Sequence, residues 1–159
     1  MLILIEGADG SGKTTLVNEL NKYWPALRIN KGQNSLADFY DSLISMCQDI
    51  VLDRSFITDI VYRLALDDSE TDGLSLPQIN SILNDSIVVY CKTKTQYDDA
   101  INRGEDNVTD LATSVKISKY YDAVMSFINT RTVTPVITYD WHKDTVQEIV
   151  DSIKQILVD

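Results

Sequence analysis

The stretch LILIEGADGSGKTT, residues 2–15, indicates the fold class of the whole chain. Its first four residues are apolar and include two β-branched side chains, which predicts a short buried strand of a parallel sheet. Gly7–Thr14 follows and satisfies the spacing G-x-x-x-x-G-K-[ST] at every fixed position. Such glycines let successive backbone N–H groups point at an anion, and the next helix adds the positive end of its dipole. The stretch therefore predicts a strand, a phosphate-binding loop and a helix.

The side chains of this loop are those expected at a nucleotide site. Lys13 can reach the β- and γ-phosphates of a nucleoside triphosphate, and the Thr14 hydroxyl can bind Mg²⁺. We therefore expect ATP as the phosphoryl donor and Mg²⁺ as the metal ion. The residues expected to contact the donor are Gly7, Asp9, Gly10, Ser11, Gly12, Lys13, Thr14 and Thr15.

Strand and helix patterns alternate along the rest of the chain, which favours an α/β fold. We predict one three-layer domain, residues 1–159, with a five-stranded parallel sheet and helices on both faces. Ligands of such sheets bind beyond the carboxyl ends of the strands. The predicted strands are 2–5, 26–30, 49–53, 86–91 and 134–140, and the predicted helices are 13–23, 35–47, 57–66, 77–83, 111–129 and 145–157.

Charge and apolar content restrict the class of protein further. The 159 residues include 14 Lys and Arg against 24 Asp and Glu, which gives a net charge of −10. Stable nucleic-acid binding is not expected, because it requires a basic surface, whereas a small nucleotide needs only local cations. No apolar stretch reaches the length of a membrane span. Cys47 and Cys91 are expected to be buried, reduced thiols, so we predict a cytoplasmic protein.

A second group of polar residues follows the predicted strand 49–53. Asp53 ends that strand, where burying a carboxylate is costly unless it has a function. In P-loop proteins a carboxylate at this position supports Mg²⁺, and the neighbouring Arg54 can bind a phosphate through two nitrogens. Pairing of Asp53 with Arg54, or capping of the following helix, is the alternative without a function. The complete phosphate loop favours the functional interpretation.

Together these motifs resemble those of the thymidylate kinases, within the P-loop nucleoside and nucleotide kinases. The family loop E-G-x-[DE]-G-x-G-K-[ST]-T matches Glu6–Thr15. The family motif D-R-x-x-x-S-x-x-A-[YF] is similar to Asp53–Tyr62, and a lid motif A-x-x-R-G is similar to Ala100–Gly104. The resemblance in order covers nearly the whole chain. Its compactness is typical of viral members, which would act in the host cytoplasm.

The resemblance implies a P-loop kinase fold and ATP- and Mg²⁺-dependent phosphoryl transfer to a deoxynucleoside monophosphate. Thymidylate or a modified pyrimidine nucleotide is the favoured acceptor, and residues 96–110 are the expected lid. Asp9 would accept a hydrogen bond from the acceptor 3′-hydroxyl, Arg54 would hold the acceptor phosphate, and Arg103 the transferring group. The catalytic candidates are Lys13, Asp53, Arg54 and Arg103, and the metal-binding candidates are Thr14 and Asp53. The acceptor-binding candidates are Asp9, Arg54, Tyr62 and Phe39. Of these, Phe39 could stack on a base.

Three other functions are alternatives. A deoxynucleoside kinase relies on a glutamate base after the second strand, and INKGQNS, residues 29–35, contains no carboxylate. A kinase acting on hydroxymethylated bases in phage DNA would need a basic groove. A nucleotide-binding switch would need a motif such as N-K-x-D, which CKTKTQYD, residues 91–98, does not supply. Lys31 is the candidate cation after the second strand for contact with the acceptor phosphate. The sequence leaves open whether the protein forms a homodimer.

Overall fold

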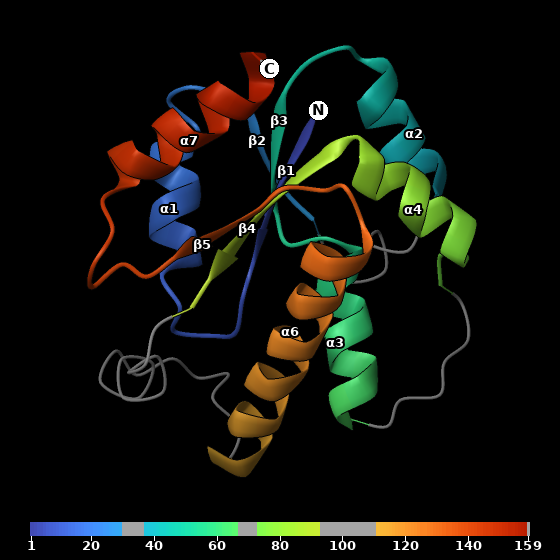
Figure 1. The fold of residues 1–159 in the computed structure, drawn as a ribbon, viewed down its shortest axis with the longest axis vertical. Coiled ribbons are helices and arrows are strands. Elements are labelled where there is room, and N and C mark those ends of the chain that lie inside the picture. The colour runs from blue at the N-terminus through green and yellow to red at the C-terminus, as the bar shows by residue number, and fades with distance from the viewer. Residues whose placement is uncertain (30–36, 67–72, 93–110, 159) are drawn as a thin grey trace.

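The computed structural model describes residues 1–29, 37–66, 73–92 and 111–158, and Figure 1 shows their arrangement. Five strands form one parallel sheet in the order β2-β3-β1-β4-β5. The elements are β1 (Leu2–Glu6), α1 (Lys13–Leu20), β2 (Ala26–Arg28), α2 (Ala37–Ser45), β3 (Ile50–Asp53), α3 (Phe56–Leu66), α4 (Leu76–Asn84), β4 (Ser86–Cys91), α6 (Leu111–Arg131), β5 (Val136–Tyr139) and α7 (Val146–Val158). The predicted five-stranded parallel sheet is confirmed.

Helices cover both faces of the sheet, as the alternation of apolar strands and helices predicts (Figure 1). Strand β1 is buried along its whole length, and its side chains alternate between the two faces. Ile3 and Ile5 pack with helices α1 and α7, whereas Leu2 and Leu4 belong to the core shared with α2, α3, α4 and α6. The three predicted layers are therefore confirmed, with one apolar core on each side of the sheet.

Strand register brings several polar residues to one edge of the sheet. Asp53 at the end of β3 pairs with Ile5 of β1, and Glu6 pairs with Tyr90 of β4. Arg28 at the end of β2 pairs with Asp53. Because all five strands are parallel, these carboxyl ends lie on the edge from which the phosphate loop leaves β1.

Helix α1 ends at Leu20, three residues before the predicted end at Tyr23. The backbone N–H groups of Tyr23 and Trp24 both donate to the Leu20 carbonyl, at 2.9 and 3.0 Å, which closes a turn. The Asn21 side chain accepts from the Ala26 N–H at 2.9 Å and so leads the chain directly into β2. The turn closed at the Leu20 carbonyl and the bond from Ala26 to the Asn21 side chain therefore end the helix earlier than the proline after Trp24 would.

The burial predicted for the two cysteines is half correct. Cys91 is buried at the end of β4, but Cys47 is exposed. Helix α2 ends at Ser45, and Cys47 lies in the following turn with a φ of +50°, away from the apolar stripe of the helix. The helical spacing of apolar residues therefore predicted a helix end two residues later than the observed one. Within the described parts of the chain, no helix has the length and apolar character needed to cross a membrane.

Candidate active site

The phosphate-binding loop connects β1 to α1 and depends on its glycines. Gly7, Gly10 and Gly12 have φ angles of +146°, +78° and +87°. A Cβ atom on Gly7 would lie 2.3 Å from the carbonyl oxygen of Cys91, and one on Gly12 would lie 2.9 Å from Cδ1 of Trp141. The loop is thus closely packed between the end of β4 and the turn after β5, which leaves no space for side chains at these two positions.

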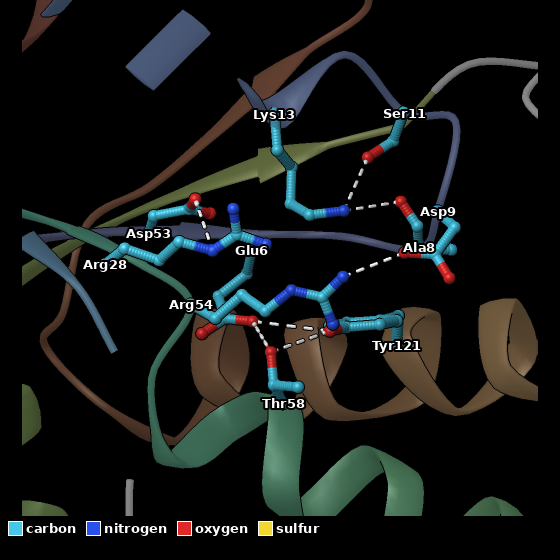
Figure 2. Close-up of polar contacts among 10 residues, drawn as sticks. All are labelled: Glu6, Ala8, Asp9, Ser11, Lys13, Arg28, Asp53, Arg54, Thr58 and Tyr121. Atoms are coloured by element: carbon cyan, nitrogen blue, oxygen red, sulfur yellow. Dashed lines mark hydrogen bonds and ion pairs between the residues drawn. The ribbon is translucent and has the colours of Figure 1, made fainter. Parts of the chain in front are cut away.

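Lys13 is buried, and Figure 2 shows its side chain pointing toward Ala8 and Ser11 of this loop. Its Nζ donates to the Ala8 carbonyl at 2.6 Å and to Ser11 Oγ at 3.4 Å. Burial, and then the nearby Arg54, lower the pKa of Lys13 from 10.5 to about 8. The ammonium group is therefore held inside the loop by two neutral oxygen atoms, so an arriving phosphate would be a strong partner.

The hydroxyl groups of the first helical turn and the Asp53 carboxylate suit a hard metal ion. Thr14 and Thr15 are exposed at the start of α1, and the Asp53 side chain is 12% exposed at the end of β3. Arg28 Nε lies 3.9 Å from Asp53 Oδ2, but the Arg28 side chain is 79% exposed, so this contact is weak. Hydroxyl and carboxylate oxygens are the ligands that Mg²⁺ takes together with water, so Thr14 and Asp53 fit the predicted metal.

Arg54 pairs with Asp9 of the phosphate loop and not with its sequence neighbour Asp53 (Figure 2). Its Nη2 donates to Asp9 Oδ1 at 2.8 Å, and both side chains are 29% exposed. The guanidinium also forms a hydrogen bond with the Tyr62 hydroxyl of α3. The structure therefore brings together three of the four predicted acceptor-binding residues, namely Asp9, Arg54 and Tyr62.

The fourth acceptor-binding candidate is Phe39. Phe39 of α2 is half-buried, packs against the hydrophobic core and meets Tyr40 edge to face, with ring centroids 5.5 Å apart. Its role in stacking on a base stays a prediction. Arg103, Lys31 and the predicted lid 96–110 lie outside the described residues, so their roles also stay predictions.

Three residues near the loop were missed by the sequence analysis, and each is placed by pairing between distant segments. Arg28 is brought to Asp53 by the register of β2 with β3. Trp141, which is 40% exposed, lies against Gly12 because the loop and the turn after β5 share one edge. Glu6 is fully buried at the end of β1. A carboxylate that ends an apolar run, as in LILIE, was the available signal for Glu6.

Glu6 accepts hydrogen bonds from two hydroxyl groups at the start of α3. Ser55 Oγ donates to Oε1 at 2.6 Å, and Thr58 Oγ1 donates to Oε2 at 2.7 Å. The Tyr121 hydroxyl of α6 lies 3.4 Å from the same Oε2. Burial raises the pKa of Glu6 from 4.5 to about 7, although the hydrogen bonds and the nearby Arg54 oppose this rise.

The fold of the chain is similar to that of solved structures of known proteins. No protein-family model and no curated protein sequence matches the chain. Among solved structures it is similar to the YorR protein of Bacillus subtilis in complex with phosphorylated GDP, with a TM-score of 0.74 and 20% identity over 99% of this chain and 95% of that one.

It is also similar to the deoxyadenosine kinase of M. mycoides, in a structure with the products dCMP and a flexible dCDP. The TM-score is 0.65, with 17% identity over 98% of this chain and 100% of that one. The same kinase with bound dATP gives a TM-score of 0.60, with 17% identity over 97% and 99% of the two chains. These likenesses establish the P-loop kinase fold that the sequence predicted.

Proposed function

We propose that this protein transfers the γ-phosphoryl group of ATP to a deoxynucleoside monophosphate, with thymidylate or a modified pyrimidine nucleotide as the favoured acceptor. The observation that carries the proposal is the position of two cations at one edge of the sheet. Lys13 lies inside the phosphate loop, and the half-buried Arg54 lies beside Asp9 of the same loop. One cation suits the donor phosphates and the other suits an acceptor phosphate.

The donor side of the site follows from the loop. Backbone N–H groups of the loop and the N-terminus of α1 would hold the phosphates, with the Lys13 ammonium neutralising their charge. Thr14 and Asp53 would hold Mg²⁺, which when bound would neutralise further charge on the phosphates. Phosphoryl transfer asks little covalent chemistry of a protein, so positioning and charge neutralisation are the main requirements.

The acceptor side favours a monophosphate over a nucleoside. A sugar hydroxyl is a poor nucleophile without a base, whereas a phosphate oxygen is already ionised and needs only to be held in line. Two carboxylates near the loop are engaged, since Asp9 pairs with Arg54 and Glu6 accepts hydrogen bonds from hydroxyl groups, and a third, Asp53, is assigned to Mg²⁺. An Asp9 carboxylate neutralised by a guanidinium is a weak base, so an ionised acceptor suits the site better.

A deoxynucleoside kinase is the second candidate. Asp9 is the observation that favours it, because this half-exposed carboxylate lies at the sheet edge and could activate a hydroxyl if Arg54 moved away. The likeness to deoxyadenosine kinase agrees with this candidate. The two candidates differ in the acceptor, and an acceptor assay therefore distinguishes them.

The first prediction concerns Arg54. Lysine keeps the positive charge but loses the planar pair of donors, so Arg54→Lys should lower kcat/KM for the acceptor on the order of 10–100-fold. The affinity for ATP should change little, because the loop is intact. Steady-state kinetics with each substrate varied in turn measure both effects. Arg131→Lys, at the exposed end of α6, is the matched control and should behave like the parent protein.

The acceptor itself is identified with the parent protein. Thymidine, thymidylate and an oligonucleotide that contains hydroxymethyluracil are assayed side by side with ATP and Mg²⁺. We expect phosphorylation of the monophosphate. Phosphorylation of thymidine without thymidylate would replace the proposal by the second candidate, and phosphorylation of the oligonucleotide alone would make DNA the acceptor.

A further inference from the structure

Glu6 holds an unusual position for a carboxylate. It is fully buried, so it cannot contact a substrate, and it lies directly before the first glycine of the phosphate loop. Its two oxygens accept hydrogen bonds from Ser55 and Thr58, residues 49 and 52 positions further along the chain. One buried side chain therefore ties the loop strand β1 to the turn between β3 and α3.

The turn that Glu6 holds is the one that contains Arg54. Arg54 has a φ of +73°, a left-handed conformation that is strained for a residue with a side chain. Its backbone N–H donates to the Ile5 carbonyl at 3.1 Å, and the next residue, Ser55, donates its hydroxyl to Glu6. These bonds, which Arg54 and Ser55 donate to two adjacent residues of β1, hold the strained turn in place. The same turn directs the guanidinium to Asp9.

The hydrogen bonds of Glu6 extend to helix α6. The Thr58 and Tyr121 hydroxyls lie 2.9 Å apart, and the Tyr121 ring stacks on Tyr90 with centroids 6.1 Å apart. Figure 2 shows the contacts that join the Glu6 carboxylate to the hydroxyls of Thr58 and Tyr121. Buried polar networks with every member bonded are rigid, so the position of Arg54 depends on groups that do not touch the substrate.

We propose that Glu6 is a positioning residue for the acceptor: through Ser55 and Thr58 it holds Arg54 in the orientation that binds the acceptor phosphate. This inference rests on the proposed function. A residue that only supported the fold would lower stability when replaced and would affect both substrates alike. A positioning residue instead affects the acceptor and acts only while Arg54 is present.

The test uses Glu6→Gln, which keeps the shape of the side chain and removes its charge. We expect KM for the acceptor to rise about tenfold, as for one misplaced charge-assisted hydrogen bond, with KM for ATP changed less than about twofold. The double variant Glu6→Gln with Arg54→Lys should lose no more acceptor kcat/KM than Arg54→Lys alone, because coupled residues are not additive. Additive losses, or equal effects on both substrates, would overturn the proposal.

Thr134→Val is the matched control, since the buried Thr134 hydroxyl donates to the Leu83 carbonyl at 2.8 Å, away from the loop. It should lower stability without changing either KM. Should Glu6→Gln not fold, Thr58→Val removes one hydroxyl of the same network without changing charge and is expected to raise KM for the acceptor in the same direction. An unchanged acceptor KM in a folded Thr58→Val protein would then overturn the proposal.

A second measurement separates this inference from the proposed function, because it needs no reaction. The Arg54 side-chain Nε–H resonance is assigned in the ¹⁵N spectrum of the parent protein by its loss in Arg54→Lys. Glu6→Gln should shift this resonance, and Thr134→Val should not. A shifted resonance in a protein that phosphorylates no monophosphate would leave the positioning role intact and remove the acceptor assignment. An unshifted resonance would remove the positioning role whatever the acceptor.

Discussion

Two charged residues near the phosphate loop are buried. Their contacts indicate whether they serve the function of the site or the stability of the fold. Lys13 and Asp53 are both buried, yet Lys13 is held mainly by acceptors of its own loop and Asp53 has a weak contact with Arg28. The lowered pKa of Lys13 shows that its burial costs free energy. Neither charge is therefore expected to stabilise the fold.

The second prediction follows for these two residues. Lys13→Ala and Asp53→Ala should each reduce turnover on the order of 10²–10³-fold, because Lys13 would neutralise the phosphates directly and Asp53 would do so through Mg²⁺. Their melting temperatures should stay near that of the parent protein. Lys22→Ala, which removes an exposed partner of Glu19, is the control and should leave both quantities unchanged. An active Lys13→Ala protein would contradict the assignment of the loop lysine.

The third prediction concerns the pH dependence of stability. The pKa of Glu6 is about 7 in the folded protein against 4.5 for the ordinary group, so the folded state binds the proton more tightly. The contribution of Glu6 to the free energy of unfolding is therefore greatest below about pH 4.5 and falls as pH rises through about 7. A change of 2–3 pKa units corresponds to roughly 3 kcal/mol.

Urea denaturation of the parent and of Glu6→Gln at about pH 5 and about pH 8 measures this effect. Glutamine does not titrate, so the parent should lose stability relative to the variant over this range, by roughly 2–3 kcal/mol. The other titrating groups are shared by the two proteins and cancel in the difference. Parallel pH profiles would show that the carboxyl group has an ordinary pKa.

At the level of elements, the packing of the loop between strands sets the tolerance of the site to substitution. Gly7 lies between β1 and the last residue of β4, and the nearest atom to an added Cβ is a backbone oxygen. Strand β4 pairs with both β1 and β5, so that oxygen cannot move away without breaking the sheet. The conformation of the loop is thus determined by strand pairing as well as by its glycines.

The fourth prediction is that Gly7→Ala destabilises the protein by at least about 2 kcal/mol, from steric overlap and the positive φ together. Urea unfolding measures the change. Gly73→Ala is the control, since an added Cβ there would meet only the flexible end of the Arg63 side chain and should change stability by less than about 0.5 kcal/mol. Equal stabilities of the two variants would contradict the close packing of the loop.

For the whole molecule, the acidic composition contrasts with a local group of cations at the carboxyl edge of the parallel sheet. The net charge is −10, yet Lys13, Arg28 and Arg54 gather at the carboxyl edge of the sheet. Local cations of this kind suit a small anion, whereas binding along a nucleic-acid strand needs an extended basic surface. On the proposed function, free nucleotides are therefore the expected partners of the site.

The fifth prediction is that a fluorescent single-stranded oligonucleotide shows no change of anisotropy with this protein at physiological salt. A fluorescent ATP analogue with Mg²⁺ should show a clear change under the same conditions, and Lys13→Ala should abolish it. Salt-dependent binding of the oligonucleotide, with affinity falling steeply as salt rises, would instead indicate contacts to many phosphates.

Local pattern was sufficient for the architecture and for the phosphate loop. Apolar runs and helical spacing placed all five strands and the described helices, and the glycine spacing identified the loop whose positive φ angles the structure shows. Both depend on neighbours in the chain, which a sequence displays directly. Within the described residues, the pattern was wrong at the ends of elements, as at Cys47, which lies in a turn after α2 where its N–H donates to the Ile44 carbonyl.

The tertiary structure decided which partners the charged side chains contact. Arg54 and Asp9 are 45 positions apart, and Glu6 and Tyr121 are 115 positions apart. Which side chains meet at the edge of the sheet depends on strand order and register, and periodicity along the chain contains neither. Asp53 and Arg54 are adjacent in sequence, but the left-handed turn at Arg54 sends their side chains to different partners.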